Sequence, residues 1–197
     1  MTRIIGGAAG GRRLHTPRGV ATRPTSDRVR EALFSAIEAW CGSLDGLRFL
    51  DLYAGSGAVG LEAWSRGAGV VTFVEQDRKT AALIARNAEM LGVHRSNVTA
   101  GSVTTALRKT PSAPYDIVFL DPPYPLSDAD VTAALAGLVA GDWLVPGALI
   151  VVERSVRGPD LRWPVGLEGE RSKKYGETML WYGHAARPPD GSAHPQE

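Results

Sequence analysis

The feature that most constrains the fold is an alternation, from residue 48 to residue 183, between short β-rich runs and segments with helical periodicity. The β-rich runs are RFLDLYA, VVTFVEQ, NVTAGS, YDIVFLDPPY, ALIVVER and ETMLWYG. Helical segments lie between them, for example at residues 78–91 and 128–139. Apolar strands separated by helices are typical of a parallel sheet covered on both faces. The sequence therefore predicts an α/β fold with a Rossmann-like, mostly parallel sheet, whose last strand follows the loop GERSKKYG and enters antiparallel.

The pattern divides the chain into three predicted parts. Residues 1–24 are rich in glycine and arginine, with short apolar runs at residues 3–5 and 13–15, so a small basic hairpin and a mobile arm fit equally well. Residues 25–183 hold the alternating pattern and form the main domain. Residues 184–197 have no periodic apolar positions, and we expect them to form a disordered tail.

A helix is predicted at the start of the main domain. Pro24 disfavours helix at the residue before it, and Thr25 or Ser26 then serves as the N-cap. Gly42 follows the last periodic position and is expected to end the helix. The apolar positions that recur at helical spacing are Val29, Leu33, Ile37 and Trp40.

A glycine-rich loop follows the first strand of the main domain and opens a helix. Gly55, Gly57 and Gly60 match the pattern G-x-G-x-x-G, and Glu75 ends the next strand twenty residues after Gly55. Such glycines let the backbone approach a ligand, and the Glu75 carboxylate can accept both hydroxyls of a ribose. These features suit a nicotinamide dinucleotide and S-adenosylmethionine (SAM) alike. Asp51 favours SAM, because a carboxylate beside the loop repels a pyrophosphate but attracts the ammonium group of a methionine.

The alternative for this loop is a tight strand-to-helix turn with no ligand. If it holds a cofactor, Ser102, after the third strand, is placed to contact an adenine. The predicted cofactor-binding residues are Asp51, Tyr53, Ala54, Gly55, Ser56, Gly57, Glu75, Gln76 and Ser102.

The fourth strand ends in Asp121-Pro122-Pro123-Tyr124, at the carboxyl edge where open α/β sheets bind ligands. The two prolines fix the backbone and contribute no N–H, which leaves a rigid corner rich in acceptors. The two protons of an exocyclic nucleobase amine can be donated to the Asp121 carboxylate and the Pro122 carbonyl, and Tyr124 can stack on the base. We therefore predict these four residues as the catalytic site of methyl transfer to an amine. The alternative is a proline strand-stop followed by a packed tyrosine.

The 197 residues carry 22 Lys+Arg and 21 Asp+Glu, so the chain has a formal charge of only +1, but the charge is segregated. Residues 1–30 have a net charge of +6 and the other 167 residues sum to −5. We interpret the basic segment as an electrostatic footprint for RNA rather than a fold-bearing element; a solvated flexible arm is the alternative. The predicted RNA-binding residues are Arg3, Arg12, Arg13, Arg18, Arg23, Arg28 and Arg30, with Lys173 and Lys174 in the loop before the last strand.

Other classes of protein are disfavoured. Cys41 is the only cysteine, and the four histidines show no metal-ligand spacing, so we expect neither an intramolecular disulfide nor a metal. The longest apolar stretch is broken by Asp142, Pro146 and glycines, and the first residues lack a signal-peptide core. We therefore expect a cytoplasmic protein without a membrane partner.

Four segments together resemble the RsmD family of 16S rRNA guanine-N2 methyltransferases: RPTSDRVREALF, DLYAGSGAVGLEAWSRGA, FVEQD and FLDPPY. The similarity runs from about residue 3 to residue 182, and RPTSDRVREALF discriminates this family from other amino-methyltransferases that share DPPY. The resemblance implies a SAM-dependent methyltransferase fold and methylation of N2 of one guanine near position 966 of 16S rRNA, within an assembled 30S subunit, by a monomer. It also implies that Asp51, Gly55, Gly57 and Glu75 bind SAM, and that residues 121–124 hold the guanine.

Three other functions share some of these features. A DNA N6-adenine methyltransferase also uses DPPY. A nicotinamide-binding oxidoreductase would use G-x-G-x-x-G and Glu75. A non-catalytic RNA-binding protein would need only the basic N-terminal segment.

Overall fold

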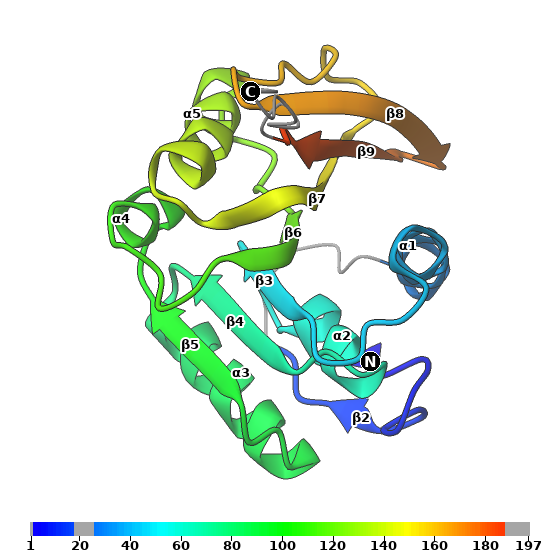
Figure 1. Ribbon diagram of the computed structural model, residues 1–197. Coiled ribbons are helices and arrows are strands. Elements are labelled where there is room, and N and C mark those ends of the chain that lie inside the picture. The colour runs from blue at the N-terminus through cyan, green and yellow to red at the C-terminus, as the bar shows by residue number, and fades with distance from the viewer. Residues whose placement is uncertain (1, 18–25, 188–197) are drawn as a thin grey trace, which may run out of the picture.

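The structure is a computed structural model that describes residues 2–17 and 26–187. Its centre is a seven-stranded sheet in the order β5-β4-β3-β6-β7-β9-β8 (Figure 1). The strands are β3 (Arg48–Leu52), β4 (Val70–Glu75), β5 (Ser96–Ala100), β6 (Tyr115–Leu120), β7 (Leu144–Ser155), β8 (Leu167–Tyr175) and β9 (Thr178–Ala185). The first five are parallel, and β9 pairs antiparallel with both β7 and β8. The predicted α/β fold with a mostly parallel sheet and an antiparallel last strand is confirmed.

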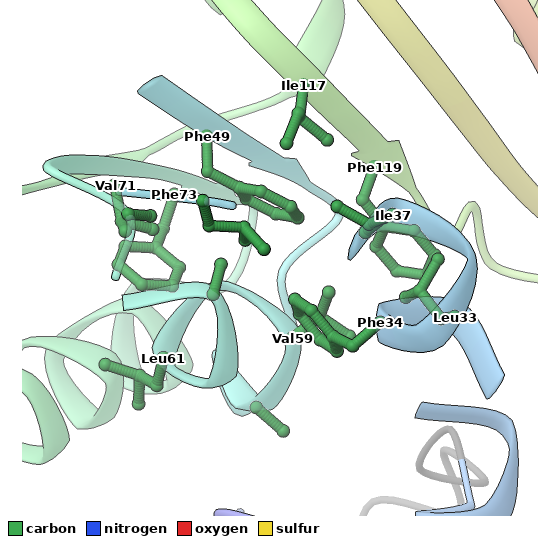
Figure 2. Close-up of a cluster of buried hydrophobic side chains, with 14 of the residues drawn as sticks. Leu33, Phe34, Ile37, Phe49, Val59, Leu61, Val71, Phe73, Ile117 and Phe119 are labelled. Atoms are coloured by element: carbon green, nitrogen blue, oxygen red, sulfur yellow. The ribbon is translucent and has the colours of Figure 1, made fainter. Parts of the chain in front are cut away.

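Helices cover both faces of this sheet. They are α1 (Asp27–Cys41), α2 (Ala58–Ser65), α3 (Arg78–Leu91), α4 (Val103–Leu107) and α5 (Asp128–Ala140). Because side chains alternate along a strand, strands β3, β4, β6, β7 and β9 each contribute side chains to two cores. Phe49, Phe119 and Val151 pack with α1, α2 and α3, whereas Leu50 and Leu120 pack with α4 and α5. Figure 2 shows the first of these cores, between the sheet and helices α1 and α2.

Helix α1 begins and ends as its sequence predicts. The Ser26 side chain accepts a hydrogen bond from the backbone N–H of Val29, and Gly42 forms the C-cap with a φ of 74°. Of the four apolar positions that recur along α1, Trp40 lies off the core face: it is 38% exposed and stacks on the His184 ring. Phe34, which is fully buried against Phe49, lies on the core face instead.

The N-terminal segment forms a hairpin, with β1 (Thr2–Arg3) paired to β2 (Arg13–Leu14). Ile4 is fully buried in the α1 core. The buried carboxylate of Glu62, on α2, accepts hydrogen bonds of 2.7 Å from the backbone N–H groups of Ile5 and Gly6. The interpretation of this segment as an electrostatic footprint rather than part of the fold is therefore wrong. The buried side chain of Ile4 and the buried carboxylate of Glu62 attach the hairpin to the main domain.

The C-terminal part differs from the prediction in two places. The segment GERSKKYG, residues 169–176, was predicted as a loop, but residues 167–175 form the edge strand β8, whose side chains are almost all exposed. Strand β9 runs beyond residue 183, since His184 pairs with Leu149 and Ala185 pairs with Leu167. The predicted tail from residue 188 onward lies outside the described residues.

Candidate functional site

Three carboxylates gather at the carboxyl edge of the central strands. Asp51 lies near the end of β3, Asp121 directly follows β6, and Glu153 lies near the end of β7. These strands are neighbours in the sheet. The side chains of Phe49, Phe119 and Val151, two residues earlier in each strand, all belong to the α1 core. By the two-residue period of a strand, the three acids lie on the α1 side of the sheet.

The glycine loop lies directly beside these acids, and each of its three glycines is used differently. Gly55 has a φ of 55° and open space where a Cβ would stand. Gly57 has a φ of 76° and is the N-cap of α2. A Cβ on Gly60 would lie 2.3 Å from the ring of Phe73, so this glycine lets α2 pack closely on β4. The space above Gly55 is where a ligand can approach the backbone.

Glu75 is held next to this space. One carboxylate oxygen accepts from the backbone N–H of Gly55 at 2.8 Å, and the other accepts from Asp77 at 2.9 Å. A carboxylate offers about four acceptor positions. Two acceptor positions of Glu75 therefore remain open after these bonds are made. The two backbone N–H groups fix the orientation of the carboxylate. This is the arrangement needed to accept two ribose hydroxyls.

Asp51 lies below the loop rather than in the open. It is 1% exposed, and its carboxylate accepts a 2.9 Å hydrogen bond from the backbone N–H of Gly60, in the first turn of α2. Burial, with a smaller contribution from the charge of Glu75, raises the pKa of Asp51 to about 8. A cation placed over the loop would restore its charge.

The remaining predicted cofactor residues surround the same edge. Ala54 donates its N–H to Val74, and the carbonyl of Ser56 accepts from the side chain of Asn87. Tyr53 has a φ of 60° and packs on the α5 side, where burial raises its pKa to about 12. Gln76 is exposed directly after β4.

Ser102 is engaged in the fold. Its hydroxyl is the N-cap of α4, a short helix that the sequence did not predict, and it accepts from the N–H of Thr105. The hydroxyl also donates to the Thr105 side chain at 2.9 Å. The adenine contact stays a prediction.

The Asp-Pro-Pro-Tyr segment forms a corner beside the glycine loop. The backbone N–H of Asp121 donates to the carbonyl of Leu52, which ties the corner to the end of β3. Burial raises the pKa of Asp121 well above its ordinary value, and the charges of Glu153 and Asp51 raise it further against the opposing effect of Arg154. Such a carboxyl group takes up a proton more readily than an exposed aspartate.

Tyr124 projects from this corner and is 62% exposed. It lines a pocket of about 260 Å³ together with Arg28 at the start of α1, Glu153 on β7, and residues 174–178 around the β8–β9 turn. The start of α1 is part of RPTSDRVREALF. The segment that discriminates the family therefore lies in one pocket with the tyrosine of DPPY.

Arg28 and Lys174 are the predicted RNA-binding residues that this pocket brings together. Three others are exposed on the hairpin or on β8: Arg3, Arg13 and Lys173. Arg12, also exposed, donates to the carbonyl of Met90 at 3.1 Å.

One RNA-binding prediction is wrong and two are outside the structure. Arg30 is 0% exposed; its guanidinium donates to the carbonyl of Arg3 at 2.7 Å and to Asp27 at 2.8 Å. It joins the hairpin to α1 and is not accessible to RNA. Arg18 and Arg23 lie outside the described residues. Lys173 and Lys174 belong to β8 rather than to a loop.

Sequence reasoning missed two residues of this edge, Glu153 and Arg154. The Arg154 guanidinium donates to the carbonyl of Leu126 at 3.2 Å and pairs with Asp128 at 2.9 Å, which anchors the chain after Tyr124. The sequence contained a signal for both residues, because Glu153 and Arg154 form a charged pair at the end of the apolar run ALIVVER, the next predicted strand after the one that ends in DPPY. In the ranges 2–17 and 26–187, no three His, Cys, Asp or Glu side chains are arranged so that they could hold a metal ion, and none of the helices there is long and apolar enough to cross a membrane.

Comparisons with known proteins identify the family of this chain. The family model "Conserved hypothetical protein 95" matches residues 2–184. Ribosomal RNA small subunit methyltransferase D of Escherichia coli K12 is 36% identical over 181 residues, which cover 89% of this chain and 86% of that protein. Putative rRNA methyltransferase YlbH of Bacillus subtilis is 35% identical over 183 residues, with 89% and 95% coverage.

Solved structures give the same result. The putative methyltransferase yhhF from Escherichia coli superposes with a TM-score of 0.83 at 32% identity, over 95% of this chain and 99% of that chain. A putative RNA methyltransferase from Pyrococcus horikoshii shares the fold, with a TM-score of 0.65 at 16% identity. The resemblance of the four sequence segments to the RsmD family is confirmed. The chain belongs to the family of ribosomal RNA small subunit methyltransferase D.

Proposed function

We propose that this protein transfers a methyl group from SAM to the exocyclic N2 amine of one guanine in 16S rRNA, near position 966, within the assembled 30S subunit. The observation that carries the proposal is the Asp121–Tyr124 corner, which lies between the glycine loop and a pocket lined by Arg28 and Lys174. The names of the E. coli and B. subtilis relatives support an rRNA substrate.

The residues of the glycine loop fit SAM. Gly55 leaves room for the ligand, Glu75 has acceptor positions for the ribose, and Asp51 supplies a negative charge under the loop. Bound SAM supplies a methyl group on a sulfonium, which is a good leaving group. The protein then has mainly to position the two reactants and stabilise charge.

Asp121 acts on the amine. Its carboxylate and the Pro122 carbonyl accept hydrogen bonds from the two N–H groups of the N2 amine. These bonds orient the lone pair of the nitrogen toward the methyl group. As the N–C bond forms and the S–C bond breaks, the nitrogen becomes positive and releases one proton to Asp121. The raised pKa of Asp121 suits it to accept that proton.

Tyr124 and the basic residues hold the RNA. The exposed ring of Tyr124 can stack on the extruded base, a contact that contributes about 1–3 kcal/mol in single-strand binders. Arg28 and Lys174 are on the pocket wall, where they meet the phosphates that flank the base. Since the chain has no separate recognition domain beside this sheet in the described residues, shape recognition of a preformed RNA supplies the remaining specificity.

Tritiated SAM tests the proposal. We expect the protein to label 16S rRNA in 30S particles that lack the modification, and the label to be N2-methylguanine at one nucleotide when mapped by RNA mass spectrometry. Naked 16S rRNA should be labelled more slowly. Folded protein that labels no rRNA would refute the function. Labelling of duplex DNA instead would favour a DNA adenine methyltransferase. Tight binding of NADH together with no binding of SAM would favour an oxidoreductase.

Lys174→Ala should weaken RNA binding and make it less dependent on salt. Loss of one phosphate contact reduces the slope of log K against log salt by about 0.7–0.9. SAM affinity should stay the same, because Lys174 lies on β8 and not at the glycine loop. Filter binding across a salt series measures the slope, and Lys109→Ala, an exposed lysine after α4, is the matched control. An equal change in both variants, or a loss of SAM binding, would contradict this role.

A further inference from the structure

A mostly buried carboxylate, Glu153, lines the pocket of Tyr124 next to the Asp121–Tyr124 corner. Glu153 is only 9% exposed. Leu120 on β6 pairs with Val152 on β7, so the next residues, Asp121 and Glu153, stand at the same level on adjacent parallel strands. Such strands are about 4.8 Å apart. The two acidic residues therefore lie side by side, and Glu153 is the one of the two that lines the pocket.

Both carboxylates face the same side of the sheet. Phe119 and Val151, two residues before Asp121 and Glu153, belong to the α1 core, and the start of α1 forms another wall of the pocket. The next residue, Arg154, extends to the other side, where it binds Leu126 and Asp128. The negative charge of Glu153 raises the pKa of Asp121. Glu153 is thus an acidic neighbour of the group that we assign to the N2 amine.

The edge of guanine explains the need for two acceptors. Its N2 amine is adjacent to N1–H, so two neighbouring positions donate hydrogen bonds, followed by the O6 acceptor. In adenine and cytosine the ring nitrogen beside the amine is an acceptor, which a carboxylate repels. Enzymes that extrude a base read it through this Watson–Crick edge.

We propose that Glu153 is a specificity-determining residue that accepts the N1–H of the target guanine while Asp121 accepts from its N2 amine. This inference rests on the proposed function and adds the reason why guanine is selected over other bases with an exocyclic amine. The charges of Glu153 and Asp51 raise the cost of ionising Asp121. Hydrogen-bond donors of the bound guanine, facing Glu153 and Asp121, offset that cost, so the identity of the base affects whether Asp121 is ionised.

The test compares two enzymes on two bases. Glu153→Gln and the wild-type protein are assayed on 30S particles whose 16S rRNA, assembled by ligation, carries either guanine or 2-aminopurine at the target. Both bases have the 2-amine, but N1 is a donor in guanine and an acceptor in 2-aminopurine. The wild type should prefer guanine by about 100-fold in kcat/KM, and Glu153→Gln should reduce that preference by about 10- to 100-fold, since its amide can donate to N1.

Controls separate this role from a structural one. Glu168→Gln removes an exposed carboxylate at the far end of β8 and should keep the wild-type preference. Glu153→Asp retains the carboxylate and should keep the preference at a lower rate, while SAM affinity reports on folding of every variant. A preference that is unchanged in Glu153→Gln, with active enzyme, would overturn the proposal for Glu153 and leave the function intact. A wild-type protein that methylates neither base would overturn the function itself.

Discussion

Replacing Asp121 by asparagine should lower the turnover number by about 1000-fold, because loss of a positioned proton acceptor costs about 10²–10⁴ in rate. Asparagine keeps one acceptor oxygen but presents an N–H₂ to the amine protons and cannot take up the proton that leaves the nitrogen. SAM affinity should change little, since the carboxylate that lies under the glycine loop is Asp51 and not Asp121. Single-turnover labelling and calorimetric titration with SAM measure the two quantities.

The pH dependence of kcat should also report on Asp121. The carboxylate is the active form, and its pKa is raised, so kcat should fall as the pH falls through a value well above that of an ordinary aspartate. Glu153→Gln removes a like charge beside Asp121 and should move this acid limb to lower pH. Asp160→Asn, an exposed aspartate, should leave rate and profile unchanged. Unchanged turnover of Asp121→Asn would exclude its role in holding the amine.

Binding of SAM should become weaker by up to about tenfold per pH unit as the pH falls below about 8, because the ligand ammonium favours ionised Asp51. In the free protein, burial keeps Asp51 protonated below that pH. Binding should therefore release a proton, which calorimetry in buffers of different ionisation enthalpy detects. Asp51→Asn should abolish both this proton release and the part of the pH dependence of SAM affinity that comes from Asp51. Ionisable groups on SAM itself contribute equally to binding by the two proteins. Proton release that persists in the variant would show that another group titrates.

Asp51 should also affect the stability of the free protein, with the opposite sign. Its folded pKa of about 8 lies above the unfolded value, so between the two values the folded state holds more protons. The free energy of unfolding should therefore decrease as the pH rises toward about 8, and Asp51→Asn should remove that decrease. Urea denaturation of both proteins at mildly acidic and mildly alkaline pH measures the difference. A charge that favours the cofactor thus destabilises the protein without it.

The sequence predicted the parts of the site that depend on order along the chain. Gly55, Gly57 and Gly60 follow a strand and open a helix, and Asp121 ends a strand, so each motif carries its own structural context. Parallel strands then bring the two motifs to one edge without further information. Glu75 was found for the same reason, as the end of the next strand.

What the sequence did not predict depends on contacts between distant segments. A charge count cannot distinguish Arg30, buried against the carbonyl of Arg3, from an arginine that meets RNA. Strand β8 was missed because an edge strand with exposed side chains shows no apolar alternation. The charged pair at the end of ALIVVER marked Glu153 as the end of a strand, but its position beside Asp121 and in the Tyr124 pocket follows from the strand register.

The direction of β9 has a consequence for how such a site changes between relatives. Thr178 pairs with Ser155 at the end of β7 and with Tyr175 at the end of β8, so the β8–β9 turn is carried to the same rim as the carboxyl ends of the parallel strands. The loops that follow β3, β4, β5 and β6 on that rim each lead into a helix that the core must accommodate, whereas this turn joins the edge strand β8 to its neighbour β9. Insertions in this turn or substitutions at Glu177 can therefore reshape the mouth of the pocket while the interior stays unaltered, which makes this hairpin a place where substrate preference can diverge at little cost to folding.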